Sequence, residues 1–231
     1  MKLPDRLLAV AGFVEAGACV VDVGTDHGYL PVYLAINGLA GGIVASDINP
    51  GPLEAARRSA ARYGLSDRIV FVCAPGLSSV GESDADTIVI SGLGGETIVA
   101  ILEEAPWTKR CGVSLILQPQ SKIDLLCCFL RDNGYCVCDA KLALDSGKLY
   151  VVMLVRGGES VSSLEPQTEL LTLLMNRSDP LFADYIDKLI TSARRVLDGR
   201  RISGLPDSTD ISARLDAYVR LKEEYENANC Q

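Results

Sequence analysis

A loop of glycine and acidic residues, DVGTDHG at positions 22–28, follows the first short apolar run of the chain. Gly24 allows a sharp turn there and lets a ligand approach the backbone closely. The loop differs from the GxGxxG dinucleotide pattern, because Thr25 and Asp26 occupy the place of its second glycine. A carboxylate at that place repels a pyrophosphate and attracts positive charge, so the loop indicates a cationic ligand.

A second carboxylate, Asp47, ends the next short apolar run, about twenty residues beyond the glycine loop. A carboxylate at the end of a second strand can accept hydrogen bonds from both ribose hydroxyls of an adenosine. S-adenosylmethionine combines an adenosine with a sulfonium and an ammonium group. The two features together therefore favour this ligand.

Each of these residues also has a simpler structural interpretation. Asp26 could cap the helix that follows it, and Asp47 could be a surface carboxylate at a strand end. His27 could bond the backbone at the helix start, and Tyr29 could pack in the core.

The composition excludes several classes of protein. With 22 basic and 30 acidic residues the 231-residue chain carries a net charge of −8, which excludes a strongly basic nucleic-acid coat protein but not a local basic patch. His27 is the single histidine, which excludes a zinc site built on several histidines, and no metal is expected. With no signal-like start and no apolar run near the ~20 residues that span a bilayer, a soluble, cytoplasmic protein without membrane contact is expected.

Short apolar runs alternate with helical patterns along the first two thirds of the chain, which predicts an α/β fold with a doubly wound parallel sheet. Strands are expected at 18–23, 42–46, 68–73, 87–90, 112–117, 135–143 and 149–155. Helices are expected at 4–15, 29–36, from Pro50 or Pro52 to 64, at 122–131 and in a segment that ends at 104. Because the last two strands follow each other directly, they predict an antiparallel pair, as in the Rossmann-like seven-stranded sheet of class I methyltransferases.

The C-terminal part has a different pattern. Residues 157–164 (GGESVSSL) are small and polar and predict a linker between a domain at 1–156 and a helical part at 164–231. Apolar residues recur at helical spacing from Leu181 to Leu197 and from Ile211 to Tyr225. A turn at 204–207 separates the two stripes, so a hairpin of two antiparallel, coiled-coil-like helices is expected.

Four short sequence motifs closely resemble those of one family. DVGTDHGYLP (22–31), SDINPGPL (46–53), SGLGGE (91–96) and LQPQ (117–120) occur in this order. With a C-terminal helical hairpin they are similar to the bacterial tRNA (adenine-22-N1)-methyltransferases, which are class I enzymes that use S-adenosylmethionine. The resemblance covers roughly residues 1–156 and implies transfer of a methyl group to N1 of adenine 22 in tRNA.

The resemblance also implies which residues form the site. Asp26, His27 and Tyr29, together with Pro31, are placed around the methyl donor and the target base. Asp26 is the first candidate to stabilise the cationic product or take its proton, His27 the second, and Tyr29 would stack or position the base. The implied cofactor-binding residues are Asp22, Gly24, Thr25, Gly28, Asp47, Ile48, Gly76, Ser91, Gly92 and Gly94.

Two positions depart from the family pattern. The word after the third strand is Ala74-Pro75-Gly76-Leu77, where the family has a GDGL-like word whose acid can contact the adenine amino group. Proline also lacks a backbone donor. Gln120 stands where the LQPN word ends in asparagine, which keeps the amide but lengthens its reach.

A tRNA partner needs a positive surface on this acidic chain. Arg194, Arg195, Arg200 and Arg201 cluster in the first long C-terminal helix and are candidates for gripping phosphates, although a solvated helix face is the usual meaning of such charges. Other basic residues mark the N-terminal helix and the helix after Pro50. Two alternatives to a tRNA methyltransferase stay open: a methyltransferase for a small molecule or another RNA, and a non-catalytic tRNA-binding protein with a degraded cofactor pocket. A dehydrogenase is disfavoured by the missing GxGxxG and by the terminal strand pair.

Overall fold

The computed structural model describes residues 1–158, 162–203, 205–206 and 208–229. Its packing divides the chain into two units, residues 1–161 and 162–231, each of which is described by itself. Parts of the expected linker (159–161) and of the expected turn (204 and 207) lie outside the described residues.

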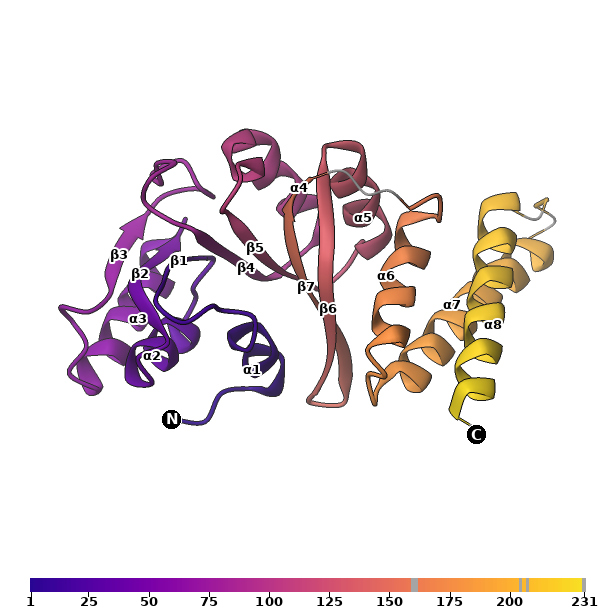
Figure 1. Ribbon diagram of the computed structural model, residues 1–231, viewed down its shortest axis with the longest axis horizontal. Helices are drawn as coiled ribbons and strands as arrows, with labels where there is room; N and C mark the ends of the chain where they lie inside the picture. The colour runs from indigo at the N-terminus through magenta and orange to yellow at the C-terminus, as the bar shows by residue number, and fades with distance from the viewer. Residues whose placement is uncertain (159–161, 204, 207, 230–231) are drawn as a thin grey trace. The chain divides into compact units, whose positions relative to one another are not determined.

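The first unit is built on one seven-stranded sheet in the order β3-β2-β1-β4-β5-β7-β6 (Figure 1). Its strands are β1 (Ala18–Val23), β2 (Ala40–Asp47), β3 (Val70–Cys73), β4 (Thr87–Leu93), β5 (Ser114–Pro119), β6 (Tyr135–Asp145) and β7 (Lys148–Gly157). β7 is antiparallel to both of its neighbours, and the pairs among β1 to β5 are parallel. The predicted doubly wound sheet with a closing antiparallel pair is therefore confirmed.

One helix of this unit precedes the first strand, and the others lie in the connections between strands. The helices are α1 (Asp5–Ala11), α2 (Tyr29–Ile36), α3 (Pro50–Arg62), α4 (Gly95–Glu104), the short 3₁₀ helix η1 (Pro106–Lys109) and α5 (Ile123–Asp132). α1 to α3 share one apolar cluster with Val20, Val89 and Ile116 of the sheet. Successive strand residues point to opposite faces, so Val21 and Ile88 belong to the other face. α1 ends four residues earlier than the predicted 15, because the chain continues in tighter turns, in which the N–H groups of Phe13 and Val14 donate to the Val10 and Ala11 carbonyls.

The described residues of the second unit form three helices, not the predicted two. α7 (Phe182–Ile202) and α8 (Thr209–Asn229) pack against each other as the expected hairpin. The additional helix α6 (Pro166–Asn176) contacts both of them. The Glu165 carboxylate caps α6 by accepting bonds from the backbone N–H groups of residues 167 and 168. The Tyr218 hydroxyl of α8 donates to Gln167 Oε1 at 2.6 Å, which fixes α6 on the hairpin.

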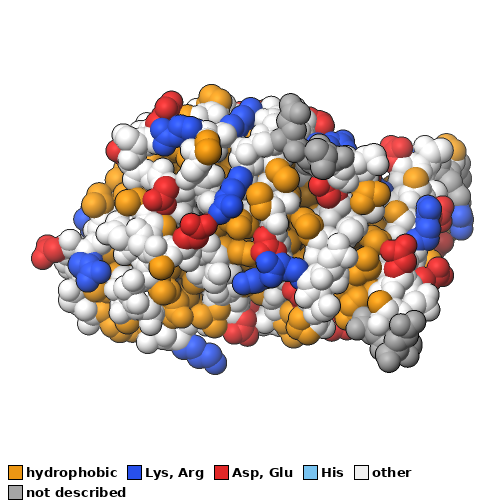
Figure 2. Space-filling model, in the orientation of Figure 1, with side chains coloured by type: hydrophobic (Ala, Val, Ile, Leu, Met, Phe, Trp, Pro, Cys, Tyr) orange, Lys and Arg blue, Asp and Glu red, His pale blue; other side chains and the backbone are white. Residues whose placement is uncertain are grey.

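The surface carries charges of both signs. On the face shown in Figure 2, Lys and Arg side chains lie among Asp and Glu side chains, with apolar side chains between them. Any basic surface on this chain is therefore local rather than general. None of the helices in the described ranges is long and apolar enough to cross a membrane.

Candidate functional site

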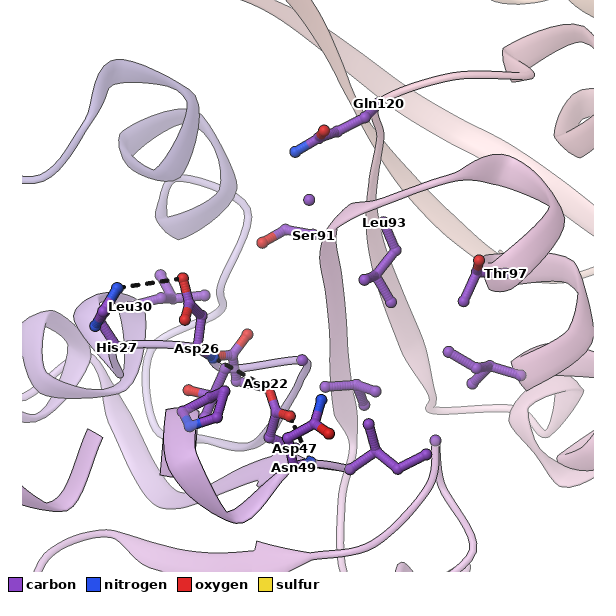
Figure 3. A pocket seen from close by; sticks show the side chains of 18 of the residues that line it. Asp22, Asp26, His27, Leu30, Asp47, Asn49, Ser91, Leu93, Thr97 and Gln120 are labelled. Atoms are coloured by element: carbon purple, nitrogen blue, oxygen red, sulfur yellow. Dashed lines mark hydrogen bonds and ion pairs between the residues drawn. The ribbon is translucent and has the colours of Figure 1, made fainter. Parts of the chain in front are cut away.

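A cavity of about 620 Å³ lies at the carboxyl ends of the central strands (Figure 3). Its wall contains the β1–α2 loop, the end of β2, the segment after β3 and the end of β4. The connections leave β1 and β4 toward opposite edges of the sheet, and this switch point is where open α/β sheets bind ligands. The volume is within the range of small-molecule sites.

The β1–α2 loop is held firmly against β2. The backbone N–H groups of Gly24 and Thr25 both donate to the Ser46 carbonyl, at 2.8 and 3.0 Å. Gly28 has φ +69°, and a Cβ there would lie 2.8 Å from the Ala56 Cβ of α3. The glycine at position 28 therefore allows α2 to begin close against α3.

Asp47 links the loop to the end of β2. It is the last residue of β2 and is buried. Its Oδ1 accepts from the Asn49 N–H at 2.8 Å, and its Oδ2 accepts from the Asp26 N–H at 3.4 Å. The interpretation of Asp47 as a surface carboxylate is therefore wrong. Its side chain faces the cavity with Asp22 and Asn49 (Figure 3).

Asp22 is the most deeply placed acid of the cavity. Burial raises the pKa of its carboxyl from 3.8 to about 6. The Thr25 hydroxyl lowers this pKa in part, and the negative charge of Asp47 raises it further. A cationic ligand group bound here would favour the ionised form and bring the pKa down again.

We expect Asp22→Asn to raise the free energy of unfolding of the ligand-free protein at pH 7 by about 2–3 kcal/mol, because each unit of pKa corresponds to about 1.4 kcal/mol. A folded pKa of about 6 means that the folded chain holds a buried charge at pH 7 that the unfolded chain holds in water. The contribution of Asp22 to stability is fully present below its unfolded pKa and is lost as the pH rises toward 6. Urea unfolding from pH 4 to pH 7 measures this. If the difference in the free energy of unfolding between variant and wild type were the same at pH 4 and pH 7, the expectation would be contradicted.

Asp26, His27 and Tyr29 form the exposed rim of the cavity. His27 Nε2 lies 3.6 Å from Asp26 Oδ2, and the His27 and Tyr29 rings are 5.4 Å apart. The N-cap of α2 is Gly28 and makes no side-chain cap bond, so the interpretation of Asp26 as a helix cap is wrong. Tyr29 is 45% exposed, so its interpretation as core packing is also wrong.

The end of β4 forms the opposite wall, and a short loop leads from it into α4. Ser91 and Gly92 line the cavity, and Gly94 is the N-cap of α4. A Cβ on Gly95 would lie 2.4 Å from the Lys122 carbonyl oxygen, so this loop packs directly on the β5–α5 connection. That packing places Gln120 at the cavity beside Gly92 (Figure 3).

The segment after β3 gives an apolar wall. Ala74, Pro75 and Gly76 line the cavity, and Ile48 lines it directly after β2, beside the end of β3. Gly76 has φ +51°, and a Cβ there would lie 3.3 Å from the Ile101 side chain of α4. No carboxylate comes from this segment, as the sequence indicated. Four polar lining residues were not assigned to the cavity from the sequence: Arg6, Asn49, Thr97 and Glu104.

The four arginines proposed to contact RNA belong to the second unit, in the C-terminal half of α7. Arg194, Arg195 and Arg201 are exposed, and Arg200 is half-buried. Arg200 Nε donates to the Pro206 carbonyl at 2.9 Å, and Arg201 lies 3.8 Å from Asp198. The described side chains contain no group of three His, Cys, Asp or Glu residues that could hold a metal ion.

Comparisons with known proteins give a consistent result. Residues 3–153 match the methyltransferase domain family. Over 159 residues, 69% of this chain and 67% of the relative, the sequence is 34% identical to the tRNA (adenine(22)-N(1))-methyltransferase of Bacillus subtilis (strain 168). The structure of the B. subtilis m1A22 tRNA methyltransferase matches with a TM-score of 0.77 and 27% identity over 98% of each chain.

A second solved structure bears on the cavity. Streptococcus pneumoniae Sp1610, a candidate tRNA (m1A22) methyltransferase solved in complex with S-adenosyl-L-methionine, matches with a TM-score of 0.81. The two sequences are 28% identical, and the match covers 96% of this chain and 100% of the other.

Proposed function

The chain belongs to the tRNA (adenine(22)-N(1))-methyltransferase family of methyltransferase-domain proteins, and from this premise we propose that it methylates N1 of adenine 22 in tRNA. It is an S-adenosylmethionine-dependent enzyme. One observation supports the proposal most: Asp26, His27 and Tyr29 are exposed at the edge of a cavity that contains two buried carboxylates, Asp22 and Asp47. A tRNA substrate also makes the cytoplasm the compartment in which we expect the chain to act.

The residues of the cavity fit S-adenosylmethionine. Its volume accommodates a nucleoside, and Asp47 offers a carboxylate at the place where ribose hydroxyls need an acceptor. We assign Asp47 to the ribose, and Ile48 and Gly76 to the adenine. Asp22 is suited to the ammonium group, because a positive charge there compensates the cost of its burial.

The remaining parts of the cofactor are assigned to residues of two glycine-containing segments of the cavity wall. We assign the methionine part of the cofactor to Gly24 and Thr25 on the first wall, while Gly28, also predicted for this part, does not line the cavity and supports the loop against α3. Ser91 and Gly92 line the second wall, beside the reacting methyl group, and Gly94 follows them as the N-cap of α4 without lining the cavity. The cofactor, when bound, supplies the methyl group.

The chain's own residues present and orient the base. Adenine N1 has a ring lone pair at neutral pH, so it needs no prior deprotonation and the reaction depends mainly on positioning. The N1 edge is hidden in a base pair, so the base must be unpaired or extruded. Tyr29, exposed at the rim, can stack on it. Asp26 can stabilise the positive charge of the methylated base or accept the proton that leaves N6.

The test of this function is transfer of labelled methyl from S-adenosylmethionine to unmodified bacterial tRNA, with the product nucleoside identified by mass spectrometry. We expect 1-methyladenosine, and we expect it to be absent when guanosine replaces adenosine 22. Transfer to the control tRNA would contradict the assigned position. Cofactor binding without transfer to tRNA would favour another substrate, and no cofactor binding would favour a non-catalytic tRNA-binding protein and implicate Pro75.

We further propose that the helical part at 164–231 is a tRNA-binding arm attached to a methyltransferase domain at 1–156. Changing Arg194, Arg195, Arg200 and Arg201 together to glutamine is expected to weaken tRNA binding about tenfold or more at 0.1 M salt. Each lost phosphate contact should also reduce the slope of log K against log salt by about 0.9. Fluorescence titrations between 50 and 200 mM salt measure both effects, within the range where such slopes are usually determined.

The matched control changes Arg57, Arg58 and Arg62 of α3 to glutamine, which removes positive charge from the first unit. Equal weakening by both variants would mean that total charge governs binding. Unchanged binding in the α7 variant would make the arm a structural element.

A further inference from the structure

Arg6 of α1 is held in place at the edge of the cavity. Its Nε lies 3.4 Å from Asp145 Oδ2 at the end of β6, and both side chains are largely buried, with 26% and 21% of their surface exposed. Residue 6 also lines the cavity. Because Nε faces Asp145, the terminal nitrogens of the guanidinium are left for other partners.

One terminal nitrogen lies over Gly92. This glycine has φ +81°, and a Cβ built on it would lie 3.9 Å from Arg6 Nη1 and 3.5 Å from Gln120 Nε2. Both nitrogens are N–H donors. Two donors from separate elements, α1 and the β5–α5 connection, therefore converge on a space that the missing side chain of Gly92 keeps open.

Arg6 differs in charge from the other charged residues of the cavity wall. The acids along the wall are Asp22, Asp26, Asp47 and Glu104, and Arg6 is the only Lys or Arg among the described residues that line it. The acids suit the cationic groups and the hydroxyls of the cofactor. Its methionine part also carries a carboxylate, for which Arg6 is the available countercharge.

Arg6 lies near the part of the cavity that we assigned to the methionine end of S-adenosylmethionine. A Cβ on Gly24 would touch the Leu93 side chain at 3.6 Å, so the β1–α2 loop meets the end of β4 at the residue next to Gly92. The space over Gly92 therefore continues from the part of the cavity that we assigned to the methionine.

We propose that Arg6 and Gln120 bind the methionine carboxylate of S-adenosylmethionine over Gly92, with Asp145 as the positioning residue of Arg6. This inference rests on the proposed cofactor and deepens its site. A guanidinium oriented before binding loses less freedom when it binds the carboxylate, so Asp145 contributes to cofactor affinity without touching the cofactor.

The experiment compares two ligands by calorimetry in the absence of tRNA: S-adenosylmethionine and its decarboxylated form, which keeps the sulfonium and the ammonium. A charge-assisted hydrogen bond corresponds to about 10- to 100-fold in affinity. We expect Arg6→Gln to weaken binding of S-adenosylmethionine by that factor and to leave binding of the decarboxylated form unchanged or slightly stronger. Asp145→Asn should weaken only the first ligand, by about threefold.

Arg68→Gln is the matched control, because it removes a positive charge from an exposed residue that does not line the cavity. It should bind both ligands as the wild type does. Arg6→Lys keeps the charge and should retain part of the preference for the carboxylate, so this variant tests the proposal if Arg6→Gln does not fold.

Equal weakening of both ligands by Arg6→Gln, or no weakening of either, would overturn the inference. So would a loss of tRNA affinity in that variant with normal discrimination between the ligands, because Arg6 would then contact an RNA phosphate. Failure of the wild type to bind S-adenosylmethionine would instead remove the proposed function, and the inference with it.

Discussion

Replacing Asp26 with asparagine is expected to lower kcat for tRNA methylation at least about 100-fold, while cofactor affinity stays within about twofold. The side chain is exposed at the rim, so its carboxylate can approach the N6 group of a base held for attack. Methylation at N1 leaves a cation until that group loses a proton, and a positioned base accelerates such a step by about 10² to 10⁴. Asparagine has the same shape but neither the charge nor the basicity.

Asparagine is also the replacement that disturbs the loop least. Asp26 has φ +47°, a left-handed conformation that asparagine adopts more readily than most residues. Its contact with Asp47 uses the backbone N–H, which the substitution keeps. Single-turnover transfer to saturating tRNA, paired with calorimetry of the cofactor, separates chemistry from binding. Wild-type turnover in the variant would remove Asp26 from the reaction and leave His27 as the next candidate.

The position of the site could be predicted because it depends on local sequence. The loop from Asp22 to Gly28 and the acid at Asp47 each follow an apolar run, and parallel strands bring their carboxyl ends to one edge of the sheet. The antiparallel pair at the end of the sheet could be predicted because two strand patterns follow each other with only a short turn around Gly147.

Other parts of the site depend on contacts between distant segments. Arg6 reaches the cavity only because α1 packs beside the sheet and Asp145 of β6 meets its side chain, 139 positions along the chain. Glu104 and Thr97 enter the wall because α4 passes beside it. The spacing of residues in the sequence does not indicate these contacts between distant segments.

The missed helix α6 has a different cause. Its cap is a glutamate, a weaker cap signal than Ser, Thr, Asp or Asn, although Pro166 stands at the favoured first position. The apolar residues of α6 pack against both α7 and α8, so they do not form one regular apolar stripe. Tyr29 was interpreted as a core residue, because an aromatic residue at helical spacing suggests core packing. Its ring lies instead at the cavity rim.

Replacing Asp47 with alanine is expected to weaken binding of S-adenosylhomocysteine about 100-fold or more. Two ribose hydroxyls that donate to a buried carboxylate each form a charge-assisted bond of about 1.5–3 kcal/mol. Removing Asp47 also takes away a charge that raises the pKa of Asp22, so that pKa should fall in the variant. Folding is therefore not expected to suffer from the lost charge. Asp67→Asn, an exposed acid outside the cavity, is the matched control.

The same substitution also removes the acceptor of the Asn49 and Asp26 N–H groups, so a loss of affinity alone does not show that Asp47 touches the ribose. Calorimetry with the 2′-deoxyribose analogue of the ligand separates the two effects. If Asp47 binds the hydroxyls, the wild type discriminates against the analogue and the alanine variant does not, because the bond in question is already missing. Equal loss for both ligands would mean that Asp47 acts by holding the β1–α2 loop against β2. Discrimination that disappears with Asp47 would instead identify its carboxylate as the group that distinguishes ribose from deoxyribose.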